Sequence, residues 1–196
     1  MADIKINGNK YNNIERVKFV GADGMSAVSF IDASILENLI TGTYTDIFYD
    51  TQITTINSNI FKSAKIGIVN MPNVKNISFQ AFQSCSATEV RFVGLQTPAG
   101  STFLAMSNLT KAVFGTSLST VPIQMFNACS KLTTLVLPYN GVATIGTDAL
   151  KSTAIASGTG YVYVPSAQVD NYKANSGWSA YANQIRALED YPDEVA

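Results

Sequence analysis

The sequence predicts a mainly β protein with some helix (α+β), built as a repeat solenoid of about five coils with a small N-terminal β module and a C-terminal helical cap. Three observations support this prediction. Apolar anchor residues recur at intervals of 21, 21, 23 and 24 residues, a small or apolar residue follows each anchor at one fixed distance, and each copy ends in a short alternating strand. A unit of this length cannot bury its own apolar side, so successive units must stack and share one core.

Residues 1–45 are predicted to form the β module, which is a possible attachment region. The Asn7–Gly8 pair in IKINGNKY indicates a tight hairpin. A second turn is expected at Gly21–Gly24, between short strands. SILENLI at Ser34–Ile40 begins with the serine and glutamate spacing of a capping box, which predicts one short helix. The residues expected on the further strands are Ile14, Val17, Phe19 and Ala27–Ile31.

Residues 46–165 are predicted to form the repeat array. The anchors are Phe61, Phe82, Phe103, Phe126 and Leu150. Five residues before them stand Ile56, Ile77, Pro98, Val121 and Ile145. Three residues after them stand Ala64, Cys85, Met106, Cys129 and Thr153. The strands that end the copies are expected at Val69–Pro72, Val90–Val93, Ala112–Gly115, Leu135–Pro138 and Val162–Pro165.

Residues 166–196 are predicted to form the helical cap and an acidic tail. An open end of a repeat stack needs such a cover. Ser166 is the expected N-cap of a first helix, and a second short helix is expected around Trp178. Trp178, Tyr181 and Ile185 fall on one face of that helix. The tail at Glu189–Ala196 is expected to fray.

Two stretches carry a family resemblance: ISFQAFQSCSATEVRF at Ile77–Phe92 and VPIQMFNACSKLTTLVLP at Val121–Pro138. They resemble the BspA-type leucine-rich repeat, and the resemblance extends over about residues 44–188. Ile155–Ile185 is similar to the closing segment of many such proteins. The resemblance implies a leucine-rich-repeat solenoid. The third copy departs from the pattern, with TPAGSTF at Thr97–Phe103, which puts the geometry of that coil in question but not the array.

Proteins of this family include bacterial surface adhesins and structural proteins of bacteriophages. The block INGNKYNNIERVKFVGADG at Ile6–Gly24 is similar to phage virion proteins of the family. The resemblance thus implies a structural or adhesive role.

The composition argues against catalysis. The chain has no histidine, which excludes Ser–His and Cys–His nucleophilic sites and histidine metal sites. Glu89 is the only acid between Thr51 and Thr147, so the array cannot hold the carboxylate pair of a glycoside hydrolase. The net charge of −1 predicts no bulk attraction to nucleic acid or membranes, and no apolar run is long enough to cross a bilayer. We therefore expect no enzyme, no cofactor, no metal site, no nucleic-acid partner and no membrane insertion.

Cys85 and Cys129 allow two interpretations, a redox pair or two buried thiols. They occupy the same repeat position two copies apart, which places them about two strand spacings, ~10 Å, from each other. A disulfide requires Cα atoms within about 7 Å. Free cysteine is commonly buried and behaves as a small apolar residue. We therefore expect two buried, unpaired thiols.

Charge is unevenly distributed along the chain. Residues 1–50 carry four basic and seven acidic groups, residues 51–147 carry six and one, and residues 148–196 carry three and six. The basic middle could attract anionic glycans or teichoic-acid-like polymers, or the acidic end of a neighbouring subunit. The alternative is that its lysines only make a solvated surface.

Alternation along the strands predicts a candidate partner-binding face. If Val90 and Phe92 point inward, Arg91 points outward, and the other strands follow the same rule. A surface of tyrosine, basic and valine side chains suits contact with protein or sugar. The alternative is that the valines meet an adjoining subunit or loop. The candidate face consists of Arg91, Lys111, Val113, Val136, Tyr161 and Tyr163.

The function expected from these observations is that of a non-enzymatic structural and adhesion protein of a bacteriophage virion. Its partners would be other virion proteins or a host cell-surface polymer, and a homo-oligomer is compatible with this role. The start MADIKINGNK lacks the pattern of a signal peptide, which favours assembly in the host cytoplasm and exposure on the particle. The alternative is a secreted or surface-anchored leucine-rich-repeat adhesin at a bacterial cell surface.

Overall fold

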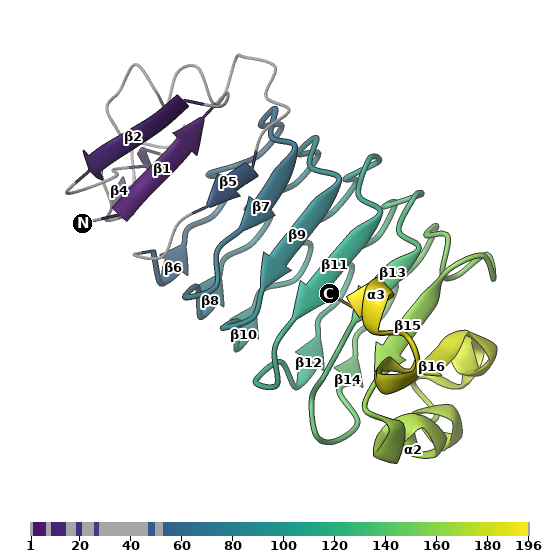
Figure 1. Ribbon diagram of the computed structural model, residues 1–196. Helices are drawn as coiled ribbons and strands as arrows, with labels where there is room; N and C mark the ends of the chain where they lie inside the picture. Colours follow the sequence, from purple (N-terminus) through teal and green to yellow (C-terminus); the bar gives the residue numbers. More distant parts are fainter. Residues whose placement is uncertain are drawn as a thin grey trace.

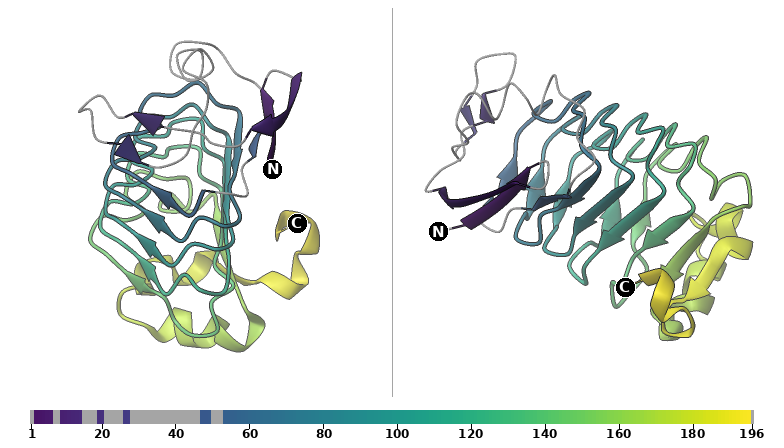
Figure 2. Two further views of the ribbon diagram at one scale, coloured as in Figure 1. Left: turned by 90° about the vertical axis from the view of Figure 1, so that its left-hand side faces the viewer. Right: turned by 45° about the horizontal axis from the view of Figure 1, so that its top comes forward.

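The structure is a computed structural model that describes residues 2–6, 9–14, 19–20, 26–27, 47–49 and 53–195. It is a repeat protein of parallel sheets, mostly β with few helices. Figure 1 shows the repeated units following one another along the chain, and in the left view of Figure 2 they overlie one another. The predicted boundaries at residues 45 and 165 stay predictions.

One long parallel sheet contains seven strands in the order β16-β15-β13-β11-β9-β7-β5 (Figure 1). Successive repeats pair in register, so that Val90 lies between Val69 and Ala112. The five predicted strands are present, each beginning and ending slightly earlier than expected. The strands are β5 (Ile47–Tyr49), β7 (Ile68–Asn70), β9 (Glu89–Phe92), β11 (Lys111–Phe114), β13 (Thr134–Val136), β15 (Tyr161–Val164) and β16 (Ile185–Ala187).

A second ladder of two-residue strands, which the sequence did not predict, lies just before the anchors. Its outward positions are exposed threonine or asparagine, and its inward positions are the apolar residues five before each anchor. The strands are β6 (Thr55–Ile56), β8 (Asn76–Ile77), β10 (Thr97–Pro98), β12 (Thr120–Val121) and β14 (Thr144–Ile145). Pro98 does not disrupt its unit, because it pairs in register with Ile77.

This second ladder is interrupted between β10 and β12. In other units the residue after the short strand donates its backbone N–H to the preceding unit, as Ala99 does to the Ile77 carbonyl at 2.8 Å. Pro122 holds that position in the fourth unit and has no N–H to donate. The break therefore follows from one proline rather than from the irregular third copy.

The anchors form the centre of one continuous core, as predicted. Phe61 is 2% exposed, and the other four anchors are fully buried. The ring of Phe82 stacks on those of Phe61 and Phe103 at centroid distances of 4.8 and 5.6 Å, and Phe126 stacks on Phe103 at 5.4 Å. Rings from the long sheet complete the cluster, with Phe92 5.6 Å from Phe82. The stacking interaction of these rings adds to the burial of their area.

The backbone around every anchor repeats one uncommon conformation. The residues two before and two after each anchor have φ between 54° and 62°. This left-handed conformation costs about 1 to 2 kcal/mol for a residue with a side chain. It directs the anchor N–H toward the next unit, and Phe126 donates to the Ala149 carbonyl at 2.8 Å. The ten residues are Asn59, Ser63, Gln80, Ser84, Ser101, Ala105, Gln124, Ala128, Asp148 and Ser152.

The C-terminal helices close one end of the stack (Figure 1). They are the 3-10 helix η1 (Ser166–Gln168), α2 (Val169–Ala174) and the 3-10 helix η2 (Ser179–Gln184). Two buried aromatics from this cap hold the last unit at Ala143. The Ala143 N–H donates to the Tyr172 hydroxyl at 3.0 Å, and the Trp178 indole N–H donates to the Ala143 carbonyl at 2.6 Å. In earlier units this carbonyl accepts from the next repeat, as Ser119 does from Thr144. Trp178 thus donates the hydrogen bond that a further repeat would donate.

Three predictions about the C-terminal region were wrong in detail. Ser166 does not cap a helix; it is the first residue of η1, and its N–H donates to the Glu189 carboxylate at 2.9 Å. Trp178 precedes a 3-10 helix, and Ile185 lies on β16, although both side chains are buried as expected. The tail has regular structure where fraying was predicted, with the 3-10 helix η3 (Leu188–Asp190) and α3 (Pro192–Val195).

Two antiparallel pairs lie before the array. β1 (Ala2–Ile6) pairs with β2 (Asn9–Ile14) on either side of the predicted Asn7–Gly8 turn. β3 (Phe19–Val20) pairs with β4 (Ser26–Ala27) across the predicted Gly21–Gly24 turn. The helix predicted at Ser34–Ile40 lies outside the described residues. Within the described parts of the chain, the longest helices have six residues, too few to cross a bilayer.

The assignment of Phe126 to the core can be tested against an exposed phenylalanine of the same chain. Replacing Phe126 with alanine should lower the free energy of unfolding by about 3 to 5 kcal/mol, because a buried ring leaves a cavity. Replacing Phe79, which is 50% exposed, should change it by about 0.5 kcal/mol or less. Urea unfolding of both variants measures the difference. Equal losses would contradict the assignment of Phe126 to the core.

The cap makes a second prediction. Tyr172→Phe leaves the buried Ala143 N–H without its acceptor and should destabilise the protein by about 1 to 3 kcal/mol. Tyr181→Phe is the control, because Tyr181 is only partly buried and lies in the same cap. It should change the stability by about 0.5 kcal/mol or less. Thermal unfolding of the two variants separates the hydrogen bond from a general effect of losing a hydroxyl.

Candidate contact face of the long sheet

The outward side chains of the long sheet form two straight rows, because its strands pair in register. We call these rows the outer face. The residues between them, such as Val90 and Leu135, point into the core. The first row is Ile68, Glu89, Lys111, Thr134 and Tyr161. The second row is Asn70, Arg91, Val113, Val136, Tyr163 and Arg186. All six predicted face residues lie in these rows.

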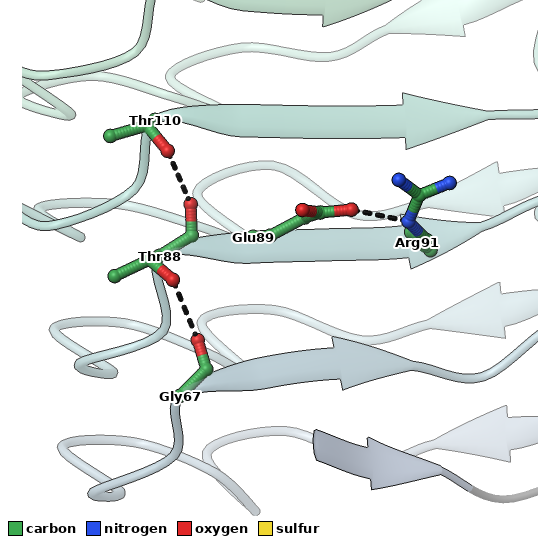
Figure 3. A network of polar contacts seen from close by, with 5 residues as sticks. All are labelled: Gly67, Thr88, Glu89, Arg91 and Thr110. Atoms are coloured by element: carbon green, nitrogen blue, oxygen red, sulfur yellow. Dashed lines mark hydrogen bonds and ion pairs between the residues drawn. The ribbon is translucent and has the colours of Figure 1, made fainter. Parts of the chain in front are cut away.

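A ladder of exposed threonines borders the first row, and sequence reasoning missed it (Figure 3). Thr88 donates its hydroxyl to the Gly67 carbonyl at 3.0 Å, Thr110 donates to Thr88 at 2.9 Å, and Thr133 donates to Thr110 at 3.2 Å. Each backbone N–H donates to the same carbonyl as the hydroxyl beside it. The recurrence of threonine immediately before three strands was the signal available in the sequence.

Glu89, the only acid between Thr51 and Thr147, neutralises part of the basic charge of the outer face. Arg91 Nε donates to the Glu89 carboxylate, and the two residues stand two apart on β9 (Figure 3). Their side chains are 28% and 20% exposed. Lys111 lies opposite Glu89 on the neighbouring strand, also half-buried. The outer face at β9 and β11 is therefore a mixed polar surface rather than a purely basic one.

The other end of the outer face is covered by the chain itself. Val113, Val136 and Tyr163 are between 3% and 6% exposed and form an apolar cluster separate from the main core. Leu188 packs against this cluster, and the Tyr191 ring lies 5.4 Å from that of Tyr163. Figure 1 shows the C-terminal segment in front of the sheet, and the left view of Figure 2 shows it beside the stacked units. The prediction that these three residues are exposed was wrong.

Arg186 lies on β16, the edge strand of the long sheet. Its guanidinium donates to the Asn183 and Ile185 carbonyls at 2.9 and 3.0 Å. The same group lies 4.4 Å from the centre of the Tyr161 ring, a cation–π contact. A charged side chain on an edge strand discourages pairing with another strand. Arg186 therefore closes this edge and holds Tyr161 in place.

A family model described as the BspA type leucine rich repeat region matches residues 54–162, in six copies. This match spans more than half of the chain. The chain belongs to the BspA-type leucine-rich repeat family. The model counts six copies where the anchors predict about five, and the ladder of short strands has five strands within the matched span.

A solved structure, a leucine rich repeat protein of T. pallidum, is similar to this BspA-type chain. The sequence identity is 22%, the TM-score is 0.50, and the alignment covers 63% of this chain and 61% of that one. The chain thus spans less than two thirds of that structure, and a likeness at this identity supports the fold alone. No curated protein sequence matches the chain.

The two cysteines are buried core residues rather than part of the outer face. Within the described part of the chain, no cluster of cysteine and acidic residues could hold a metal ion. The prediction of two free, buried thiols is confirmed. Burial raises the pKa of Cys85 from 9.0 to about 11 and that of Cys129 to about 12. Cys129 donates its S–H to the Phe103 carbonyl at 3.0 Å. Both thiols stay protonated at neutral pH and act as core residues.

The structure aligns the six predicted residues in two rows, and their role in binding a partner stays a prediction. Arg91 and Lys111 lie at its open end, and Tyr161 is half-buried beneath Arg186. Val113, Val136 and Tyr163 meet the chain's own C-terminal segment, which was the alternative for the valines. Sequence reasoning could not locate this segment, because alternation defines the direction of a side chain and not what lies above it.

The raised thiol pKa values predict a stability loss at alkaline pH. The unfolded chain releases thiol protons above pH 9, whereas the folded chain retains them, so the free energy of unfolding falls as pH rises. Between pH 9 and pH 10 the loss should be about 1 kcal/mol for each thiol. Urea unfolding across this range should show a shallower decline in the double variant Cys85→Ala, Cys129→Ala. The tyrosines contribute equally to both proteins, and identical declines would contradict the assignment.

Proposed function

We propose that this protein is a non-enzymatic contact module, in which a solenoid of BspA-type repeats displays its outer face to a protein or a host-surface glycan. The observation that supports the proposal most directly is the pair of in-register rows on the long sheet. Because every strand contributes the same positions, the rows present aligned polar and basic side chains where the C-terminal segment leaves them uncovered. Repeat families of this type are generally binding modules, which agrees with a chain that has no histidine.

The open end of the outer face is the part of the proposed surface that the C-terminal segment leaves uncovered, as judged from the described residues. Ile68, Asn70, Arg91 and Lys111 are half-buried there, and Val93 at the end of β9 is 48% exposed. The threonine ladder borders this region with exposed methyl groups while its hydroxyls bond to the backbone. This mixture of apolar and charged groups provides both contact area and orientation.

Two biological settings fit this proposal equally well. One is a component of a bacteriophage particle, supported by the resemblance of Ile6–Gly24 to virion proteins of the family. The other is a bacterial surface protein, supported by the adhesins of the same repeat class. Mass spectrometry of purified particles and of peptides released from intact cells by protease distinguishes them. Detection of the chain in particles would favour the first setting, and detection at the cell surface would favour the second.

The outer face makes a direct prediction about binding. The double variant Arg91→Glu, Lys111→Glu should bind whole host cells roughly tenfold more weakly, because charge complementarity steers association at such surfaces. Lys62→Glu with Lys65→Glu is the matched control, since it changes the net charge equally at two exposed positions outside the long sheet. The control should bind within about twofold of the original protein. Unchanged binding by the first variant would remove the outer face from the proposed function.

A further inference from the structure

The C-terminal residues 188–195, which we call the tail, occupy the outer face as a bound segment would. The tail follows β16 without a connecting loop and turns back over the sheet, where the Tyr191 N–H donates to the Leu188 carbonyl at 3.2 Å. It adds no strand to either ladder. Its position in front of β11 and β13 in Figure 1 places it across the strands and not along them.

Two apolar side chains, three residues apart, attach the tail to the sheet. Leu188 packs against the cluster of Val113, Val136 and Tyr163. The Tyr191 ring meets that of Tyr163 edge to face, at 65° and 5.4 Å. Beside them, the Glu189 carboxylate accepts the Ser166 N–H. Without the tail, two valines and a tyrosine in adjacent strands would form an exposed apolar patch.

The tail is held lightly compared with the rest of the cap. Tyr191 remains 39% exposed, whereas Trp178 and Tyr172 are fully buried. The side chains of Glu189, Asp190 and Asp193 are exposed. Leu188 is half-buried and Tyr191 is exposed, and a segment fixed by such side chains belongs to the part of a protein that opens most readily. The tail can therefore leave the sheet without unfolding the repeats.

Charge also distinguishes the tail from the surface beneath it. The tail sequence LEDYPDEV contains four acids and no basic residue. The outer face carries Arg91 and Arg186 on either side of the apolar cluster in its own row, and Lys111 in the other row, against one acid, Glu89, which pairs with Arg91. An acidic segment with an aliphatic and an aromatic anchor is thus complementary to this surface in both charge and hydrophobicity.

We propose that the cluster of Val113, Val136 and Tyr163 is a docking site for a short acidic segment of a partner protein, and that the tail is its intramolecular occupant. The partner segment carries an aliphatic and an aromatic side chain three residues apart, and it binds by displacing the tail. This inference rests on the proposed function, because it assigns a partner chemistry to one part of the outer face. The tail then regulates access, since the site opens only when the partner competes with it.

A peptide experiment on the full chain tests this proposal. The probe is a fluorescently labelled synthetic peptide ALEDYPDEVA, which reproduces residues 187–196. The protein is the full-length double variant Leu188→Ser, Tyr191→Ser, in which the tail loses both anchors. Fluorescence anisotropy should show saturable binding of the peptide to this variant. The wild-type chain should bind at least about tenfold more weakly, because its own tail competes at an effective concentration of about 1 mM.

Two controls establish where the peptide binds. A peptide in which the leucine and the tyrosine are both serine keeps the charge and should not bind. Adding Val136→Glu to the released variant places an acid in the docking site and should abolish binding of the original peptide. Cooperative thermal unfolding confirms that each variant retains its repeats. If the double tail variant does not fold, Tyr191→Ala alone serves, because the ring it removes is already partly exposed.

The outcomes distinguish this inference from the broader proposed function. A folded, released variant that does not bind the peptide would overturn the docking site, even if Arg91→Glu with Lys111→Glu still reduced binding to cells. Equal affinity in the wild-type and released proteins would overturn the role of the tail as occupant. A concentration-dependent dimer of the wild-type chain that the tail variant loses would assign the site to a second copy's tail, and would also overturn the proposal of a partner segment.

Discussion

Hydrogen bonding between units one repeat apart is the constraint on which the rest of the structure depends. The four phenylalanine anchors donate their N–H groups to the next unit, and the left-handed residues on both sides of each anchor are tolerated because they make this bond possible. The stacked rings of Phe61, Phe82, Phe103 and Phe126 fill the space behind these bonds. Backbone register and ring stacking impose the same spacing between repeats. Pairing one repeat with the next out of register by one residue would therefore break both the hydrogen bonds and the ring contacts.

A fixed register also determines what the surface can do. Equivalent positions superimpose from strand to strand, so any residue type that recurs in the repeat becomes a row, as the threonine ladder illustrates. The same constraint creates a difficulty at the last unit, whose backbone groups have no next unit to bond. Tyr172 and Trp178 meet the N–H and the carbonyl of Ala143, and Arg186 covers the Ile185 carbonyl. The cap therefore acts through particular hydrogen bonds as well as through its bulk.

The sequence predicted the parts of the fold that apolar burial controls. The five anchors and the inward positions of the long strands are buried, as their periodicity in the sequence predicts, because apolar residues recur where side chains face the core. The two-residue strands of the second ladder left no such record, since a threonine beside an apolar residue is too short a pattern to identify. The cap of η1 was mispredicted because Ser166 bonds through its backbone to Glu189, a residue distant in sequence. Local propensity does not contain such tertiary contacts.

On the outer face, the rule of side-chain alternation predicted the direction of the side chains correctly and their exposure incorrectly. Alternation requires that Val113, Val136 and Tyr163 leave the core if Ala112, Leu135 and Val162 enter it, and the structure obeys this rule. Apolar side chains that leave a core still favour burial, so a second layer must come from elsewhere in the chain or from a partner. Among the side chains that the structure describes, the tail contributes Leu188 and Tyr191 to that layer. The small number of side chains in this layer is the basis of our proposal that a competitor of similar chemistry displaces the tail.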